Sequence, residues 1–126
     1  MLKKIILTLS TLWMVSCSAH DEHYFTTHPQ ALQSSLHQCE MQNADDAKCQ
    51  KLKAIASRLN DLALQLRSNP QDFGKQILVL QQTVAQQEAG LQKDGNQSEL
   101  KASLSKNKRQ LNERLAVVKW LESPES

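Results

Sequence analysis

Apolar residues recur at intervals of three and four through the chain from residue 50 onward. Between the polar turn at residues 43–46 and the breaker "SNPQD" the repeat consists of Leu52, Ile55, Leu59, Leu62 and Leu66. This spacing places every member on one face of an α-helix, which has about 3.6 residues per turn. No stretch sustains the alternation typical of a β-strand, and aromatic residues make up only 4% of the chain. The sequence therefore predicts an all-α protein.

Two longer helices are expected downstream, over about residues 71–93 and 99–122. Their apolar stripes are Ile77, Leu80, Val84 and Leu91 in the first, and Leu100, Leu104, Leu111, Leu115 and Val118 in the second. Asn69-Pro70 ends the preceding helix, because a residue before proline avoids helical conformation. Matched helices joined by the short turn "KDGNQS" predict a long antiparallel αα-hairpin over residues 71–122.

Polar residues interrupt the stripes of this hairpin where the two helices should meet. Gln87 or Glu88 falls at such a position in the first helix, and Asn107 or Lys108 in the second. Polar residues in a helical seam can set register or oligomeric state at some cost in stability. With few aromatic side chains the core is expected to be thin, which favours a slender helical bundle or a homodimer that shares its apolar stripe.

Residues 1–16 have the pattern of a signal peptide. The positive start "MLKK" precedes the apolar run "IILTLSTLWMV", which is shorter than the roughly 20 residues that span a bilayer. No second apolar stretch follows, so no spanning helix is expected in the mature chain. The run ends in "MVSC", which resembles the lipobox of bacterial lipoproteins. The resemblance implies acylation of Cys17 by chains such as palmitate, and Ser18, where inner-membrane lipoproteins carry Asp, implies an outer-membrane anchor facing the periplasm. The alternative is an ordinary secretory cleavage near Ala19.

The cysteines and the charge limit the classes of function. If Cys17 is lipidated, Cys39 and Cys49 remain, and the bacterial periplasm is oxidising, which predicts a disulfide. The alternatives are a metal pair or two free thiols, although C-x9-C lacks the zinc-knuckle spacing. Of 15 Lys and Arg residues, Lys3 and Lys4 lie in the signal peptide, and the other 13 balance 13 Asp and Glu. A neutral body gives no reason to expect nucleic-acid binding.

The first mature segment contains "HDEH", in a stretch expected to be a flexible tether over residues 17–26. His20, Asp21, Glu22 and His23 could hold a divalent ion loosely, but a solvated tether is the simpler interpretation. A single helical domain is expected over residues 27–122, with disulfide-linked helices over 27–67 and a loose tail over 123–126. Thr27 should cap the first of these helices, with Pro29 in its first turn, and Asp45 or Asp46 the next.

No motif of a known catalytic class is present, and we expect neither an enzyme nor a cofactor or metal centre. Two features could contact a partner. Residues 101–119 concentrate Lys101, Lys106, Lys108, Arg109, Arg114 and Lys119 against one Glu113, which indicates either a solvated helix face or a patch for anionic lipid or an acidic protein. Trp120 could close the end of the bundle or anchor a protein partner.

The segment "YFTTHPQALQSSLHQC" places an aromatic pair shortly before His-Pro and a cysteine eleven residues after the His. Over residues 1–50 the chain resembles the entry exclusion lipoproteins of conjugative, type IV secretion elements. The matching positions are Cys17, Tyr24, Phe25, His28, Pro29, Leu32, Leu36, Cys39 and Cys49. The resemblance implies that the protein blocks incoming conjugative transfer by binding part of the transfer apparatus.

The two long helices beyond Pro70 exceed what short members of that family carry. The alternative function is therefore a structural or assembly lipoprotein of a secretion system or the cell envelope, using the hairpin as a coiled-coil handle. In either case the candidate contacts with a protein partner are Lys108, Arg109, Arg114 and Trp120.

Overall fold

The computed structural model describes residues 18–123, and within that range every regular element is a helix. The helices are α1 (Ser18–Thr27), α2 (Pro29–Met41), α3 (Ala47–Ser68), α4 (Pro70–Lys93) and α5 (Ser98–Glu122). The predicted all-α class is thereby confirmed. The signal peptide over residues 1–16, the lipidation site Cys17 and tail residues 124–126 lie outside the described residues.

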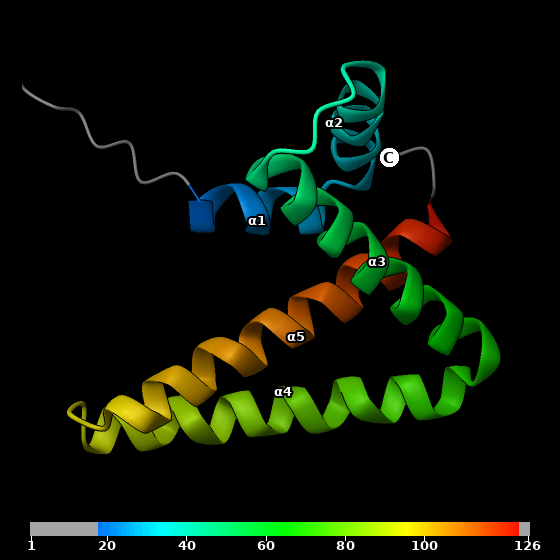
Figure 1. Cartoon of the computed structure of the whole chain (residues 1–126). Coiled ribbons are helices and arrows are strands. Elements are labelled where there is room, and N and C mark those ends of the chain that lie inside the picture. Colours follow the sequence, from blue (N-terminus) through cyan, green and yellow to red (C-terminus); the bar gives the residue numbers. More distant parts are fainter. Residues whose placement is uncertain (1–17, 124–126) are drawn as a thin grey trace, which may run out of the picture.

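Helices α4 and α5 form the long antiparallel hairpin that the sequence predicted, and they pack together near the connecting turn and diverge toward the open end (Figure 1). Helix α3 crosses this hairpin near its open end and contacts α1, α2, α4 and α5. The short helices α1 and α2 lie on the other part of α3 (Figure 1). Helix α3 is therefore the central element that joins the N-terminal helices to the hairpin. Among residues 18–123, none of the helices combines the length and the apolar character that crossing a membrane requires.

Side-chain caps explain where α3 and α4 begin. Asp46 Oδ1 accepts a hydrogen bond of 2.8 Å from the backbone N–H of Cys49, as predicted for the start of α3. Asn69 ends α3 and also caps α4, because its Oδ1 accepts from the backbone N–H of Asp72 at 3.1 Å. One residue thus closes one helix and opens the next, which makes the α3–α4 corner sharp.

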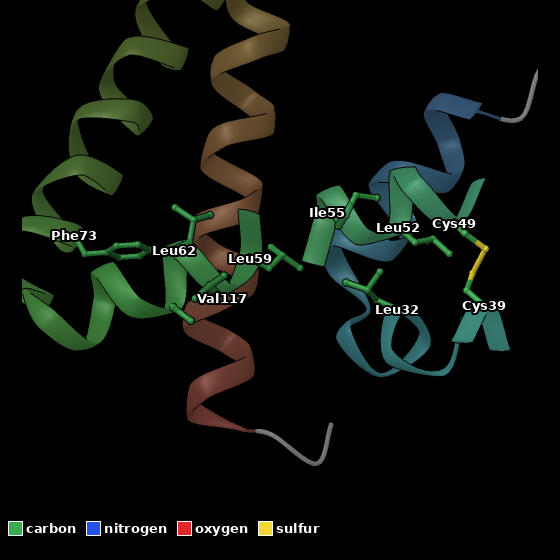
Figure 2. Packing of buried hydrophobic residues seen from close by; sticks show 10 residues of the cluster. Leu32, Cys39, Cys49, Leu52, Ile55, Leu59, Leu62, Phe73 and Val117 are labelled. Carbon is green, nitrogen blue, oxygen red and sulfur yellow. A yellow bond between two sulfur atoms is a disulfide. The ribbon is translucent and has the colours of Figure 1, made fainter. Parts of the chain in front are cut away.

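The core forms a row along one face of α3 (Figure 2). Four predicted stripe residues of α3 are buried, namely Leu52, Ile55, Leu59 and Leu62. Leu32 of α2 covers one end of the row, and Phe73 of α4 and Val117 of α5 cover the other. Burying each of these large side chains contributes about 1.5–3 kcal/mol, so this row provides most of the apolar stabilisation.

The predicted disulfide is present between Cys39 and Cys49, with a Cα–Cα distance of 6.0 Å. Both cysteines are buried, and the bond joins the end of α2 to the start of α3 (Figure 2). Between them Asn43 adopts a positive φ of 47°, a conformation that asparagine tolerates better than most residues. The disulfide thus holds the α2–α3 hairpin closed beside Leu32 and Leu52.

The N-terminal segment differs from the expected flexible tether, because residues 18–27 form α1. Phe25 packs against the core, and Thr26 is 4% exposed with its hydroxyl donating to the carbonyl of Glu22. Thr27 was expected to cap α2 but is the last residue of α1, and its hydroxyl donates back to the carbonyls of His23 and Tyr24. The sequence did not predict this helix because residues 18–27 show no apolar periodicity.

The apolar stripe of α5 is also rotated relative to the prediction. Val117 and Glu113 are buried, whereas Leu115 is 41% exposed. On α4, Phe73 is 2% exposed and was missing from the predicted stripe. Because α3 crosses the open end of the hairpin, the buried face there is set by α3 as well as by the α4–α5 seam.

The polar residues expected in the seam bond to one another across it. Gln87 Nε2 donates to Ser103 Oγ at 2.9 Å, and Asn107 Nδ2 donates to Gln87 Oε1 at 3.1 Å. Lys108 forms an ion pair with Glu88 beside them. Such specific partners favour a single register between α4 and α5.

Candidate partner-binding groove

An open groove of about 720 Å³ lies between the α1–α2 junction and the C-terminal end of α5. We call it the aromatic groove. Its walls combine apolar and polar residues, and the apolar or aromatic ones are Tyr24, Pro29, Ala31, Leu115, Ala116 and Trp120. Polar side chains of His23, His28, Gln30, Asn112 and Lys119 also line it. Residues that are almost one hundred positions apart in the chain therefore share one concave surface.

The α1–α2 junction is built around His28. Its Nδ1 lies 2.8 Å from the carbonyl oxygen of Tyr24, near the end of α1. Because a carbonyl can only accept a hydrogen bond, Nδ1 carries the proton and donates. His28 thus satisfies a carbonyl at the C-terminal end of α1, while Pro29 starts α2. This arrangement forces a tight corner between the two helices.

Tyr24 forms the aromatic wall of the groove at this corner. Its ring stacks on the ring of His28, with centroids 4.1 Å apart and an interplanar angle of 17°. Its other neighbour is Phe25, edge-on at 5.5 Å. The tyrosine side chain is nevertheless 46% exposed, so the stack orients the ring while leaving much of it free for contact.

The opposite wall is formed by one face of α5. Glu113 and Val117 are buried against the rest of the protein, and Leu115, Ala116 and Trp120 line the groove. Trp120 is half-buried, in accord with a ring that lines the groove. An exposed leucine beside a tryptophan is a contact surface of the kind used in protein–protein interfaces.

An ion-pair network fixes the two walls relative to each other. Arg58 of α3 donates to Glu113 of α5 at 3.2 Å and to Glu22 of α1 at 3.0 Å. Glu113 is 7% exposed, and its carboxylate therefore depends on this partner. Arg58 thus connects the helix that carries Tyr24 to the helix that carries Trp120.

The residues of the His-Pro motif divide into two sets. Leu32 is buried, and Phe25 and Leu36 pack against the core, so these three hold the N-terminal helices together. Tyr24, His28 and Pro29 line the aromatic groove instead. The motif is therefore partly structural and partly surface.

The candidate contacts on α5 do not form one site. Trp120 lines the aromatic groove, whereas Lys108 and Arg109 line an adjoining groove nearer the middle of the helix. Arg114 turns toward α4, where it donates to Gln76 Oε1 at 2.9 Å and lies 5.8 Å from the ring centroid of Phe73. Arg114 thus stabilises the hairpin and lies outside the aromatic groove.

The sequence alone did not predict Leu115 and Asn112 as groove residues, nor the ion pairs of Arg58. The sequence placed Leu115 in the apolar stripe because its spacing fits, and only the rotation of α5 brings it to the surface. For the proposed metal ligands, the side chains of His20 and Asp21 lie outside the description. Within the described part of the chain, no group of three or more potential ligands gathers.

No protein-family model, curated protein or solved structure shows significant similarity to this chain.

Proposed function

We propose that this protein is an acylated envelope lipoprotein that acts by binding a protein partner in the aromatic groove, with exclusion of incoming conjugative transfer as the outcome. Acylation would occur at Cys17 and hold α1 at the periplasmic face of the outer membrane. The lipobox-like "MVSC" supports the anchor, and the His-Pro motif supports the exclusion function.

One observation carries the binding site. Three positions of the His-Pro motif, Tyr24, His28 and Pro29, line the same groove as Trp120, which was selected independently as a partner anchor. Tyrosine and tryptophan are enriched among the few interface residues that contribute most of the binding free energy. The apolar walls would desolvate an apolar segment of the partner, and the polar residues around them would provide hydrogen bonds and selectivity.

The mechanism requires no chemical step. A partner segment held between Tyr24 and Trp120 would be unavailable for its normal contacts in the transfer apparatus, so binding by itself would block assembly. Preorganisation supports this role, because His28 and the Arg58 network hold both walls in place before a partner arrives. A preformed groove avoids part of the ordering cost of binding.

The test is a mating assay into recipient cells that express the protein. Wild-type recipients should receive the element of the protein's own host at a much lower frequency than recipients without it. Exclusion should be lost in Cys17→Ala, which cannot be acylated, and in Tyr24→Ala/Trp120→Ala. Each aromatic residue at such a site contributes about 2 kcal/mol or more, so the double variant should weaken partner binding by at least about a hundredfold.

The matched control is Met41→Ala, because Met41 is 74% exposed and lies outside the groove. It should exclude as well as wild type, and immunoblotting should confirm equal accumulation of all variants. If wild-type recipients receive the element as readily as empty ones, the exclusion function is refuted. If the Tyr24→Ala/Trp120→Ala variant still excludes fully, the aromatic groove is not the binding site.

A second candidate function rests on the hairpin. Leu78 and Val79 are adjacent residues of α4 that are 60% and 59% exposed. Neither of them belongs to the buried core around α3. An assembly lipoprotein that uses the hairpin as a handle would bind through such residues. In that case Leu78→Ala/Val79→Ala should abolish co-purification with the envelope partner, while Tyr24→Ala/Trp120→Ala should leave it intact.

A further inference from the structure

A second groove, of about 490 Å³, lies between α1 and the first half of α5 and adjoins the aromatic groove, with which it shares His23 and Asn112. We call it the cationic groove. Leu91 of α4 and Leu104 of α5 contribute apolar surface to it. Lys101, Lys108 and Arg109 contribute the cations, all from α5. An apolar surface edged by cations suits a ligand with an anionic head and an apolar body.

The positive charge of this groove is only partly neutralised. Lys108 pairs with Glu88, and Glu22 on the α1 wall is engaged by Arg58. The side chains of Lys101 and Arg109 take part in no ion pair or hydrogen bond within the described part of the chain. Two unpaired cations therefore border the groove, and guanidinium and ammonium groups are the usual protein ligands of phosphate.

The groove also lies close to the position of the proposed anchor. Its α1 wall consists of Glu22, His23 and Thr26, and α1 begins at the residue that follows Cys17. Glu22 lies four residues beyond Ser18, where α1 begins, which is about 6 Å along the helix axis at 1.5 Å per residue. In Figure 1 the start of α1 and the α4–α5 turn lie on the same side of the molecule. A bilayer that holds Cys17 would thus be about one Debye length, roughly 8 Å, from this groove.

From these observations we infer that the cationic groove binds the phosphate of anionic phospholipid in the membrane that holds the anchor, with Lys101 and Arg109 as the phosphate ligands. The inference rests on the acylated Cys17 of the proposed function. Docking would lay the first half of α5 on the bilayer and keep its C-terminal half, with Trp120, available to a protein partner. The occupant is a membrane lipid because one wall of the groove is α1, which begins at the residue after the proposed anchor.

The test uses the full chain, processed and acylated in cells, with a fluorophore on Ala102→Cys beside the groove. The protein is reconstituted in vesicles of phosphatidylcholine alone, or of phosphatidylcholine mixed with phosphatidylglycerol, each containing a nitroxide-headgroup quencher. Quenching should be stronger in the anionic vesicles and should weaken as salt is added. A cation near an anionic surface contributes about fivefold to the docked population, so Lys101→Gln/Arg109→Gln should lower the docked-to-undocked ratio by about 25-fold.

The matched control is Arg67→Gln/Lys75→Gln, which removes the same charge from the α3–α4 corner at the opposite end of the hairpin. It should be quenched like the parent protein. Equal quenching of the acylated parent in the two kinds of vesicle, or equal loss in the control, would overturn the cationic groove while leaving the anchor intact. Mass spectrometry separates the two proposals, because a mature chain without acyl groups would refute the anchor and this inference together.

Discussion

The Arg58–Glu113 pair should respond asymmetrically when either partner is replaced by methionine. Glu113 is 7% exposed, and Arg58 is its ion-pair partner within the described residues. The side chain of Arg58 is 43% exposed and has a second partner, Glu22. Arg58→Met therefore leaves a buried carboxylate without compensation, whereas Glu113→Met leaves a guanidinium that water and Glu22 still satisfy.

The size of the effect follows from the burial of each group. Removing one partner of a fully buried pair costs about 3–5 kcal/mol. Because water reaches Arg58, we expect Arg58→Met to lower the free energy of unfolding by about 2 kcal/mol, less than that full cost. Glu113→Met should lower it by at most about 1 kcal/mol, since methionine fills the buried space without a charge. The double variant should be no less stable than Arg58→Met, because the unpaired carboxylate is gone.

Urea unfolding followed by far-ultraviolet circular dichroism measures all three values. Lys53→Met is the control, because its pair with Asp45 at 3.6 Å is exposed on both sides, and it should shift the free energy by less than about 0.5 kcal/mol. If Glu113→Met is as destabilising as Arg58→Met, or if the two costs simply add, the burial argument is wrong.

Three further predictions concern stability and use the same unfolding assay. Phe73→Ala should lower the free energy of unfolding by about 3–5 kcal/mol, because Phe73 is 2% exposed. The control Leu78→Ala should change this free energy by less than about 0.5 kcal/mol, and similar values for the two variants would contradict the described core. Cys39→Ser/Cys49→Ser should cost about 2.5 kcal/mol through the short closed loop, and a reductant should reproduce that loss in the parent but have no effect on the variant. Gly74→Ala should raise the free energy by about 0.5–1 kcal/mol, because an added Cβ meets no atom within 4 Å in this helix; a destabilised variant would refute it.

The sequence predicted the long helices well because their folding signals are local. Asp46 and Asn69 cap the helices they precede, and the stripe of α3 from Leu52 to Leu62 is the core. The disulfide was predicted from the cysteine count together with the expected oxidising compartment. The seam residues Gln87 and Asn107 could be located from the heptad pattern, although their hydrogen bond required the relative register of two helices.

The errors share one physical cause, since they depend on where helices cross. Phe73 and Val117 are buried because α3 crosses the open end of the hairpin, and Leu115 is exposed for the same reason. Helix α1 lacks apolar periodicity and is held by tertiary contacts of Phe25 and Glu22. The aromatic groove could be predicted only in part. The sequence identifies Tyr24 and Trp120 as aromatic residues, but it does not show that they line the same groove.

If Cys17 is the anchor, a helix that begins at the next residue limits the volume that the folded domain can reach. A flexible linker of ten residues would have a root-mean-square length of roughly 18 Å and would allow the folded domain to adopt any orientation. Helix α1 instead packs on α3 and α5 and is joined to both through Arg58. If the protein is anchored next to α1, the folded domain would keep a nearly constant distance and tilt relative to the membrane. A partner could then be bound only at that distance from the membrane. The frequency of binding would therefore depend on the surface density of the protein and not on the length of its tether.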